Sequence, residues 1–185
     1  YLTTQLMEVD IPLIVALNMT DVLEKNGDKL DVKTLEKRMG VPVVEISALK
    51  DTNTDLLMKR AVETAKNKRE GSSVLRTSGL GSAVAHAEKL LKDAGVPAPL
   101  FHAVKLVEKD ELEVKSHPSE AAEVEKYLKA NDYENGEFGG DSEAEIADAR
   151  YKYISENFSP VLTKSKKRAD NGLTASDKAD RLLTN

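Results

Sequence analysis

Hydrophobic and polar residues follow two different patterns along this chain, and the pattern changes between Lys66 and Thr77. Before that segment, short apolar runs alternate with stretches of helical periodicity. Strand, helix, strand and helix in this order predict parallel pairing with a right-handed crossover. After the segment only helical periodicity is found, so the second half is predicted as a bundle of short helices without strands.

The first half contains turn and cap residues that set the predicted element bounds. The apolar run over 11–17 favours a strand buried on both faces of a parallel sheet. Asp31 is a typical residue before a helix, and Gly40 is a typical residue directly after one. The predicted elements are a helix tail over 2–8, strands over 11–17 and 41–46, and helices over 32–39 and 53–67, the last with Leu56, Leu57, Ala61 and Val62 on one face.

Proline residues mark helix starts in the second half, because proline is favoured in the first turn of a helix. Pro97 and Pro99 precede one apolar stretch, and Pro118 precedes another. The predicted helices cover residues 80–93, 97–109 and 118–130, a stretch that begins at Asp141 or Ser142, and a last stretch from Thr174 to Leu183.

Composition excludes several classes of function. The chain has 185 residues, a net charge of −5 and no cysteine, so disulfides, thiolate zinc sites and thiol nucleophiles are excluded. An acidic chain with few aromatic residues is not typical of a nucleic-acid binder. No apolar run approaches the roughly 18 residues of a membrane span. The chain starts at Tyr1 and not at Met, so we expect a fragment of a longer protein.

Polar residues follow both predicted strands at their carboxyl ends, where open α/β sheets bind ligands. Asn18 and Asp21 follow the first strand, and Ser47 and Ala48 follow the second. A carboxylate can accept two N–H groups from one planar ring, as guanine N1 and N2 offer, and an asparagine both donates and accepts. The Ser47–Ala48 turn could direct a backbone N–H at guanine O6. Alternatively, Asn18 and Asp21 only cap a turn.

The two segments Asn18-Met19-Thr20-Asp21 and Ser47-Ala48-Leu49 resemble the guanine-specificity motifs of small G domains. Met19 in the second position of the first motif resembles the cytosolic part of FeoB-type ferrous iron transporters, as do the segments Ala149-Arg150-Tyr151 and Ser176–Asp180. The resemblance covers essentially the whole chain. The resemblance implies an α/β partial G domain, with two parallel strands and helices, followed by an all-α helical bundle. It divides the chain into the C-terminal part of a GTP-binding domain over 1–68, a linker over 69–77, and a helical spacer over 78–185 that leads to an absent membrane domain.

The resemblance also implies a ligand. Guanine would be bound by Asn18, Met19, Asp21, Ser47 and Ala48, with GTP or GDP as the nucleotide. The phosphate-binding pattern Gly-x-x-x-x-Gly-Lys-Ser/Thr does not occur in the chain. We therefore expect Mg²⁺ binding only with a missing N-terminal part of the G domain, and no GTP hydrolysis by this chain alone. No catalytic residue and no metal ligand is assigned.

The expected partners are guanine nucleotide, the missing N-terminal part of the G domain, the membrane permease of the same protein and further copies in an oligomer, and no nucleic acid is expected. The expected location is the cytoplasmic side of a bacterial membrane. The alternative is a helical protein-interaction module with a non-binding α/β cap. A ribosome- or tRNA-associated GTPase would need a basic face, which an acidic chain does not favour.

The three histidines, His86, His102 and His117, lie on three different predicted elements. Their spacing does not match any paired-ligand motif. We therefore expect surface or capping roles for them and no metal site.

Overall fold

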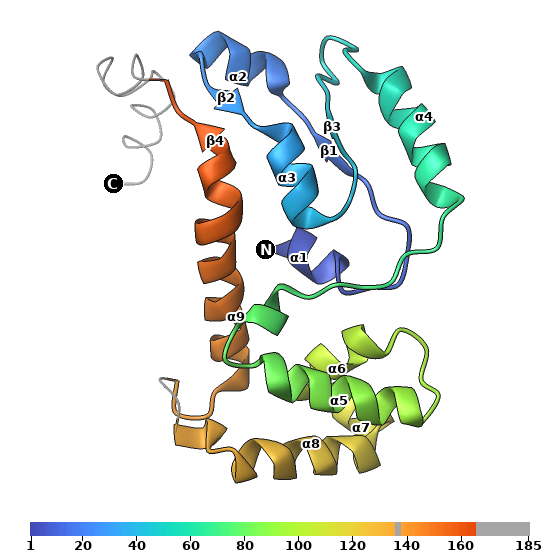
Figure 1. The fold of residues 1–185 in the computed structure, drawn as a ribbon, viewed down its shortest axis with the longest axis vertical. Coiled ribbons are helices and arrows are strands. Elements are labelled where there is room, and N and C mark those ends of the chain that lie inside the picture. Colours follow the sequence, from blue (N-terminus) through green and yellow to red (C-terminus); the bar gives the residue numbers. More distant parts are fainter. Residues whose placement is uncertain (136–137, 166–185) are drawn as a thin grey trace. The chain divides into compact units, whose positions relative to one another are not determined.

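The computed structural model describes residues 1–135 and 138–165, which form two compact units (Figure 1). The helical unit comprises Tyr1–Leu13 and Thr64–Glu156, and the α/β unit comprises Ile14–Glu63 and the described residues 157–165. These units do not follow the predicted ranges 1–68 and 78–185, because the first residues belong to the helical unit and the last described residues to the α/β unit. The predicted helix from Thr174 to Leu183 lies outside the described residues.

Two parallel strands form the sheet that was predicted for the first half (Figure 1). Strand β1 (Val15–Leu17) pairs with β3 (Val43–Glu45), with Val15 opposite Val43 and Leu17 opposite Glu45. The other elements of this part are strand β2 (Lys29–Leu30) and helices α2 (Thr20–Asn26), α3 (Val32–Met39) and α4 (Thr54–Ala65).

Helix α3 has the bounds that its sequence predicts. The Asp31 carboxylate accepts a hydrogen bond from the Thr34 backbone N–H at 3.0 Å, which satisfies a donor that the helix itself leaves unpaired. At the other end Gly40 has a φ of 67°, a conformation in which a side chain would be strained. Leu35 and Met39 are buried, as the apolar periodicity requires.

The first strand was expected to be buried on both faces, and this expectation is wrong for the described residues. The strand over 11–17 shrinks to Val15–Leu17, and none of its residues is buried, with Ala16 exposed. Helix α4 has no buried residue, and its apolar side chains Leu56 and Val62 are 45% and 57% exposed. In the part of the chain that the structure describes, β1 pairs with β3 alone, so no described strand pairs with its second edge.

A strand also occurs in the second half, where none was predicted. Strand β4 (Leu162–Thr163) pairs antiparallel with β2, and Leu30 lies opposite Leu162. The backbone N–H of Asp31 extends the pairing with a hydrogen bond of 2.9 Å to the Val161 carbonyl. A two-residue strand is too short for an alternating pattern, and its partner is distant in the sequence, so no local signal could predict it.

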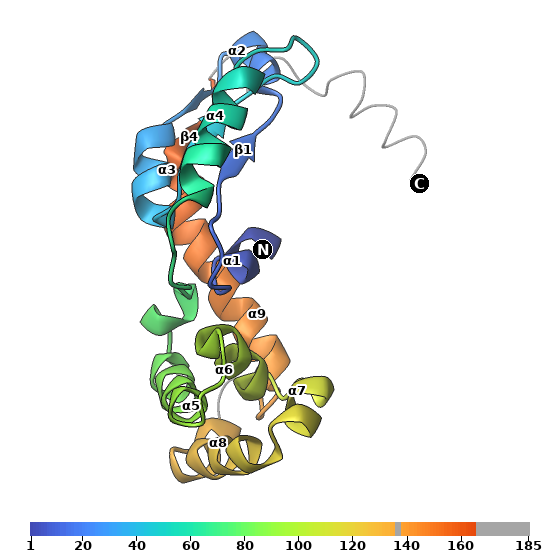
Figure 2. The same cartoon turned by 90° about the vertical axis from the view of Figure 1, so that its right-hand side faces the viewer.

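The helical unit is built from short helices that pack on one another. Helices α5 to α8 lie next to one another in both views (Figures 1 and 2). Within residues 1–135 and 138–165, no helix has both the length and the apolar character needed to cross a membrane. The α-helices of this unit are α1 (Leu2–Leu6), α5 (Gly81–Asp93), α6 (Pro99–Val107), α7 (Glu111–Ser116), α8 (Pro118–Ala130) and α9 (Ser142–Tyr153), and its 3-10 helices are η1 (Val74–Thr77) and η2 (Tyr133–Asn135). A π-helix η3 (Ile154–Phe158) follows α9, and the 3-10 helix η4 (Ser159–Val161) belongs to the α/β unit.

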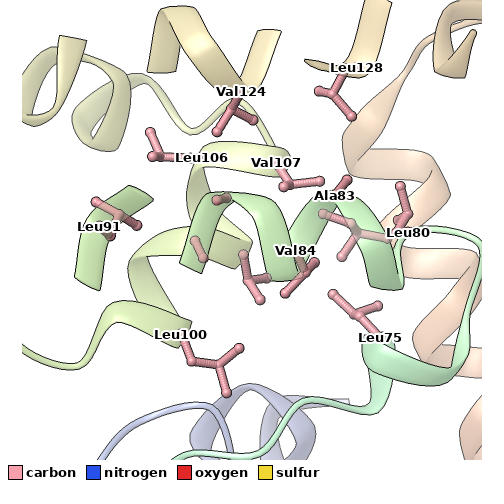
Figure 3. Close-up of a cluster of buried hydrophobic side chains, with 14 residues drawn as sticks. Leu75, Leu80, Ala83, Val84, Leu91, Leu100, Leu106, Val107, Val124 and Leu128 are labelled. Atoms are coloured by element: carbon pink, nitrogen blue, oxygen red, sulfur yellow. The ribbon is translucent and has the colours of Figure 1, made fainter. Parts of the chain in front are cut away.

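One apolar cluster forms the core of this unit (Figure 3). Helix α5 contributes a stripe at helical spacing, in which Val84, Ala87 and Leu91 are fully buried. Leu100 and Val107 from α6 and Val124 from α8 face this stripe. The predicted apolar periodicity therefore identifies the core side of α5.

Helix α5 begins at Gly81, where the backbone of Arg76 leaves no space for a side chain. A Cβ atom added to Gly81 would lie 2.5 Å from the backbone oxygen of Arg76, whereas one added to Gly79 would meet nothing within 4 Å. We therefore expect Gly81→Ala to destabilise the protein by about 1–3 kcal/mol through overpacking. Gly79→Ala, the matched control, should leave the urea denaturation midpoint nearly unchanged. Equal midpoints for the two variants would contradict this reading of the α5 entry.

Candidate functional site

The two loops that follow β1 and β3 are joined by hydrogen bonds. The Asn18 side-chain oxygen Oδ1 accepts from the Met19 backbone N–H at 2.8 Å and from the Ala48 backbone N–H at 3.1 Å. One side chain thus connects the carboxyl ends of two neighbouring parallel strands. The sequence placed these residues at one sheet edge, and the structure brings them into contact.

The turn after β1 has an uncommon backbone conformation. Met19, which precedes α2, has a φ of 67°, in the left-handed region that few residues other than glycine adopt. Thr20 holds this turn against the second strand, because its backbone N–H and its hydroxyl both donate to the Ile46 carbonyl, at 3.2 and 3.0 Å. As a result, the Met19 side chain points into solvent and is 64% exposed.

The turn after β3 is closed by its own backbone. The Ser47 N–H donates to the Thr52 carbonyl at 3.2 Å, and the Thr52 N–H donates back to the Ser47 carbonyl at 3.0 Å. The Asn53 side-chain amide donates to the Glu45 carbonyl at 3.0 Å and fixes the exit from the turn. Ser47 is buried as a result, while Ala48 remains exposed at the tip.

Asp21 is held by the second loop. The Ser47 hydroxyl donates to Asp21 Oδ1 at 2.9 Å, and this hydrogen bond lowers the pKa of the Asp21 carboxyl, to which the nearby Lys50 ammonium adds a smaller effect. The Lys50 Nζ lies 3.6 Å from Asp21 Oδ2. Asp21 is therefore an oriented carboxylate that can only accept hydrogen bonds near neutral pH.

The Asp21 carboxylate keeps acceptor capacity for a ligand. Each carboxylate oxygen has two lone-pair positions, and Ser47 uses one of them. The contact with Lys50 is long and its ammonium is 59% exposed, so this ion pair contributes little and can open. Besides Ser47 and Lys50, the backbone N–H of Asp21 itself contacts the carboxylate, and lone-pair positions remain for further hydrogen bonds.

The Ala48 backbone N–H is used within the loop pair. The sequence indicated that a backbone N–H of the Ser47–Ala48 turn could point at a ligand carbonyl oxygen, and in this structure the Ala48 N–H donates to Asn18 Oδ1 at 3.1 Å. This hydrogen bond closes the two turns on each other, so the Ala48 N–H supports the loop pair.

Two residues that sequence reasoning missed contribute to this site. Thr20 anchors the first turn through both of its donors, and Lys50 lies beside the Asp21 carboxylate. Thr20 lies inside the segment Asn18–Asp21 and Lys50 directly follows Ser47–Leu49, so their position in the sequence could have indicated them. Their contacts cross from one loop to the other, which only the folded chain shows.

The structure brings two of the histidines together. His102 and His117 both contact Glu113, at 2.7 and 3.2 Å. His117 also holds a capping position, as the sequence indicated, because it ends α7 and precedes α8. His86 differs, since its ring stacks on Tyr127 with ring centroids 4.2 Å apart. Helices α6 and α7 fold back on each other, and the chain spacing of these residues gives no sign of that.

Comparison with known proteins matches both halves of the chain to one family. Residues 1–61 match the family described as ferrous iron transport protein B, and residues 79–163 match the FeoB cytosolic helical domain. A Porphyromonas gingivalis fusion of Fe(2+) transport protein A and the Fe(2+) transporter FeoB is 28% identical over 198 residues, covering 100% of this chain and 23% of that protein. The Fe(2+) transporter FeoB of Escherichia coli K12 is 39% identical over 66 residues, 36% of this chain and 8% of that protein.

Solved structures of FeoB proteins share the fold. An S. thermophilus NFeoB variant bound to GDP has a TM-score of 0.75 and 32% identity, over 88% of this chain and 63% of that chain. The cytosolic domain of L. pneumophila FeoB has a TM-score of 0.66 and 26% identity, over 88% of this chain and 61% of that chain. The chain thus spans less than a quarter of the curated relatives named here and less than two thirds of these solved chains. On this evidence, the chain belongs to the FeoB family and represents part of its cytosolic region.

Proposed function

We propose that this chain carries the guanine-reading loops of a GTP-binding domain, followed by the helical spacer, of a ferrous iron membrane transporter. One observation supports the proposal most directly. An oriented carboxylate, Asp21, lies at the joined carboxyl ends of two parallel strands and is held by Ser47 at 2.9 Å. Relatives whose structures are described as GDP-bound share this fold.

Each residue of the proposed site has a role that follows from its chemistry. Asp21 accepts the N1–H and N2–H groups of guanine, and Ser47 keeps its carboxylate in position. Asn18 and Ala48 hold the two loops together, so that the binding edge does not widen. Met19 lies exposed beside them and covers one face of the planar base with its apolar side chain.

Phosphate and Mg²⁺ are assigned to a segment that this sequence does not contain. Backbone amides, a lysine and a hydroxyl of a Gly-x-x-x-x-Gly-Lys-Ser/Thr loop bind them in GTP-binding domains, and the pattern does not occur here. We therefore propose that residues 1–68 are the C-terminal part of a G domain and that this chain alone does not hydrolyse GTP. The exposed apolar residues of α4 and the second edge of β1 support this, because a larger sheet would cover them.

The proposed partner beyond the nucleotide is the membrane permease of the same protein, with the helical spacer over 78–185 between it and the G domain. The FeoB relatives support this arrangement, since they are described as Fe(2+) transporters. The chain would then lie on the cytoplasmic side of a bacterial membrane. The turn over 47–53 leads directly into α4, so a change of nucleotide that moves this turn would reach the helical residues that follow.

Asp21→Asn in the longer parent protein tests the proposal. The amide presents a donor to guanine N1–H or N2–H, so we expect GDP affinity to fall roughly tenfold to hundredfold. Xanthine carries a carbonyl oxygen where guanine carries the amino group, and the amide can donate to that oxygen. The variant should therefore prefer xanthosine diphosphate to GDP, as measured by titration of fluorescent nucleotides.

Asp55→Asn is the matched control, because Asp55 is an exposed carboxylate in the first turn of α4, outside the site. It should bind GDP like the unchanged protein. If Asp21→Asn binds GDP with undiminished affinity, guanine reading by this carboxylate is excluded. If the unchanged parent does not bind GDP at all, a helical interaction module with a non-binding α/β cap remains as the function.

A further inference from the structure

We propose that His102, Glu113 and His117 form a binding site for a first-row divalent transition-metal ion, of the Zn²⁺ and Fe²⁺ class, where helices α6, α7 and α8 meet. The three side chains converge within the helical unit, so the site is separate from the loops around Asp21. The inference does not depend on guanine binding, and either proposal can fail without the other.

The ligand atoms are already gathered. His102 Nδ1 lies 2.7 Å from Glu113 Oε1, and His117 Nε2 lies 3.2 Å from the same oxygen. One donor atom from each residue can be chosen so that all three lie within 4.8 Å of one another. Bonds of about 2.0–2.1 Å to a tetrahedral ion place neighbouring ligand atoms about 3.4 Å apart. Small side-chain rotations are therefore enough to admit an ion.

The fold positions Glu113 and His117 by backbone interactions. The Asp110 carboxylate accepts from the backbone N–H groups of Leu112 and Glu113, at 3.0 and 3.2 Å, and thereby starts α7. His117 ends α7: its backbone N–H donates a hydrogen bond of 2.9 Å to the Glu113 carbonyl. The His117 carbonyl in turn accepts a hydrogen bond from the Ala121 backbone N–H in α8. Since His117 occupies the corner between two helices, its ring is held over Glu113.

The donor set favours one class of ion. Two imidazoles and one carboxylate suit zinc and the neighbouring transition metals, whereas Mg²⁺ and Ca²⁺ prefer oxygen ligands. With no cysteine and only three histidines in the chain, these are two of the few strong nitrogen ligands available. Three protein ligands leave a coordination position open for water or another group.

Access and protonation are compatible with metal binding. The side chains of His102, Glu113 and His117 are 29%, 12% and 21% exposed, so an ion can reach the site from solvent. A neutral imidazole carries one N–H, and each ring can place it on the nitrogen that faces away from Glu113. The lone pairs of His102 Nδ1 and His117 Nε2 would then bind the metal ion, and the negative charge of Glu113 would neutralise part of the positive charge of the ion.

Without a metal, the same contacts form a hydrogen-bonded network in which both rings donate to Glu113. Nuclear magnetic resonance of the ¹⁵N-labelled histidine rings of this 185-residue chain separates the two readings, with Zn²⁺ as the probe. On metal addition we expect large ¹⁵N shifts at His102 Nδ1 and His117 Nε2, with the N–H on the other nitrogen of each ring. His86, which stacks on Tyr127, should not shift.

Calorimetric titration with Zn²⁺ quantifies the site. We expect His102→Gln and His117→Gln each to weaken binding at least roughly tenfold, and His86→Gln, the matched control, to leave it unchanged. Circular dichroism of each metal-free variant shows whether it still folds. Mg²⁺ should not produce the ring shifts. Zn²⁺ binding that is unchanged in both His102→Gln and His117→Gln would overturn the proposal. So would ¹⁵N shifts at His86 in place of the two other rings, or no ring shift at all at millimolar Zn²⁺.

Discussion

Replacing Arg150 by methionine is expected to lower the free energy of unfolding by about 3–5 kcal/mol, because it leaves a buried carboxylate without its cation. The Arg150 guanidinium lies 2.7 Å from Glu8 Oε2, and the two side chains are 1% and 2% exposed. The Ser73 hydroxyl donates to the other Glu8 oxygen at 2.7 Å. Glu8, Ser73 and Arg150 therefore connect the segment after α1, the segment before η1 and helix α9 within the helical unit.

The loss should depend on pH. Burial raises the pKa of the Glu8 carboxyl above its ordinary value, although Arg150 and Ser73 act against this. Without Arg150, the pKa of Glu8 in the folded variant rises further. A carboxyl group whose pKa is higher in the folded than in the unfolded protein favours folding while it is protonated. The folded protein loses this stability as the pH rises through the folded-state pKa. The destabilisation of Arg150→Met should therefore be larger at about pH 8 than at about pH 5.

Urea denaturation at the two pH values measures this effect. Arg76→Met is the matched control, because the Arg76–Glu88 pair has a similar distance of 2.6 Å but an arginine side chain that is 45% exposed. Its loss should cost at most about 1 kcal/mol. A double variant, Glu8→Met with Arg150→Met, should recover much of the stability, since no unpaired charge remains. Equal losses for Arg150→Met and Arg76→Met would contradict this account.

The second large effect is expected at Leu91. Its side chain is fully buried in the α5 stripe (Figure 3), so Leu91→Ala removes apolar contacts and leaves a cavity. We expect a loss of about 2–5 kcal/mol in the free energy of unfolding. Thermal denaturation followed by circular dichroism should show a clearly lower melting temperature.

Leu112 provides the matched control for this prediction. It is 76% exposed, so Leu112→Ala should change the stability by only about 0.5 kcal/mol. Leu91→Met, which keeps the volume, should cost less than about 1.5 kcal/mol. If Leu91→Ala had the same melting temperature as the unchanged protein, the apolar cluster around α5 would not be a main source of stability for this unit.

Local signals predicted the elements that local chemistry determines. Asp31 and Gly40 gave the bounds of α3, and Pro118 gave the start of α8. Each of these residues acts on its own neighbours, by accepting a nearby N–H, adopting a positive φ or fixing its own φ. The apolar stripe of α5 is likewise a local pattern, because apolar residues on one helix face recur at a regular spacing along the chain.

Contacts between distant segments were not predictable in this way. Leu162 pairs with Leu30 in a strand of two residues, and Arg150 pairs with Glu8 across most of the chain. In sequence terms, Arg150 is one charged residue in a polar helix, which predicts a solvent-exposed side chain. Burial changes its role, and burial is a property of the packing and not of the local sequence.

The sequence by itself determined the two parallel strands and most of the longer helices, because caps, turns and periodicity act over a few residues, but it did not indicate the short helices α2 and α7. It also placed Asn18 and Asp21 at one sheet edge with Ser47 and Ala48. Only the tertiary structure decided that Ser47 orients Asp21, that the Ala48 N–H closes onto Asn18, and that two separate histidines meet at Glu113. Distances between side chains from different elements depend on how those elements pack, and no local pattern encodes that.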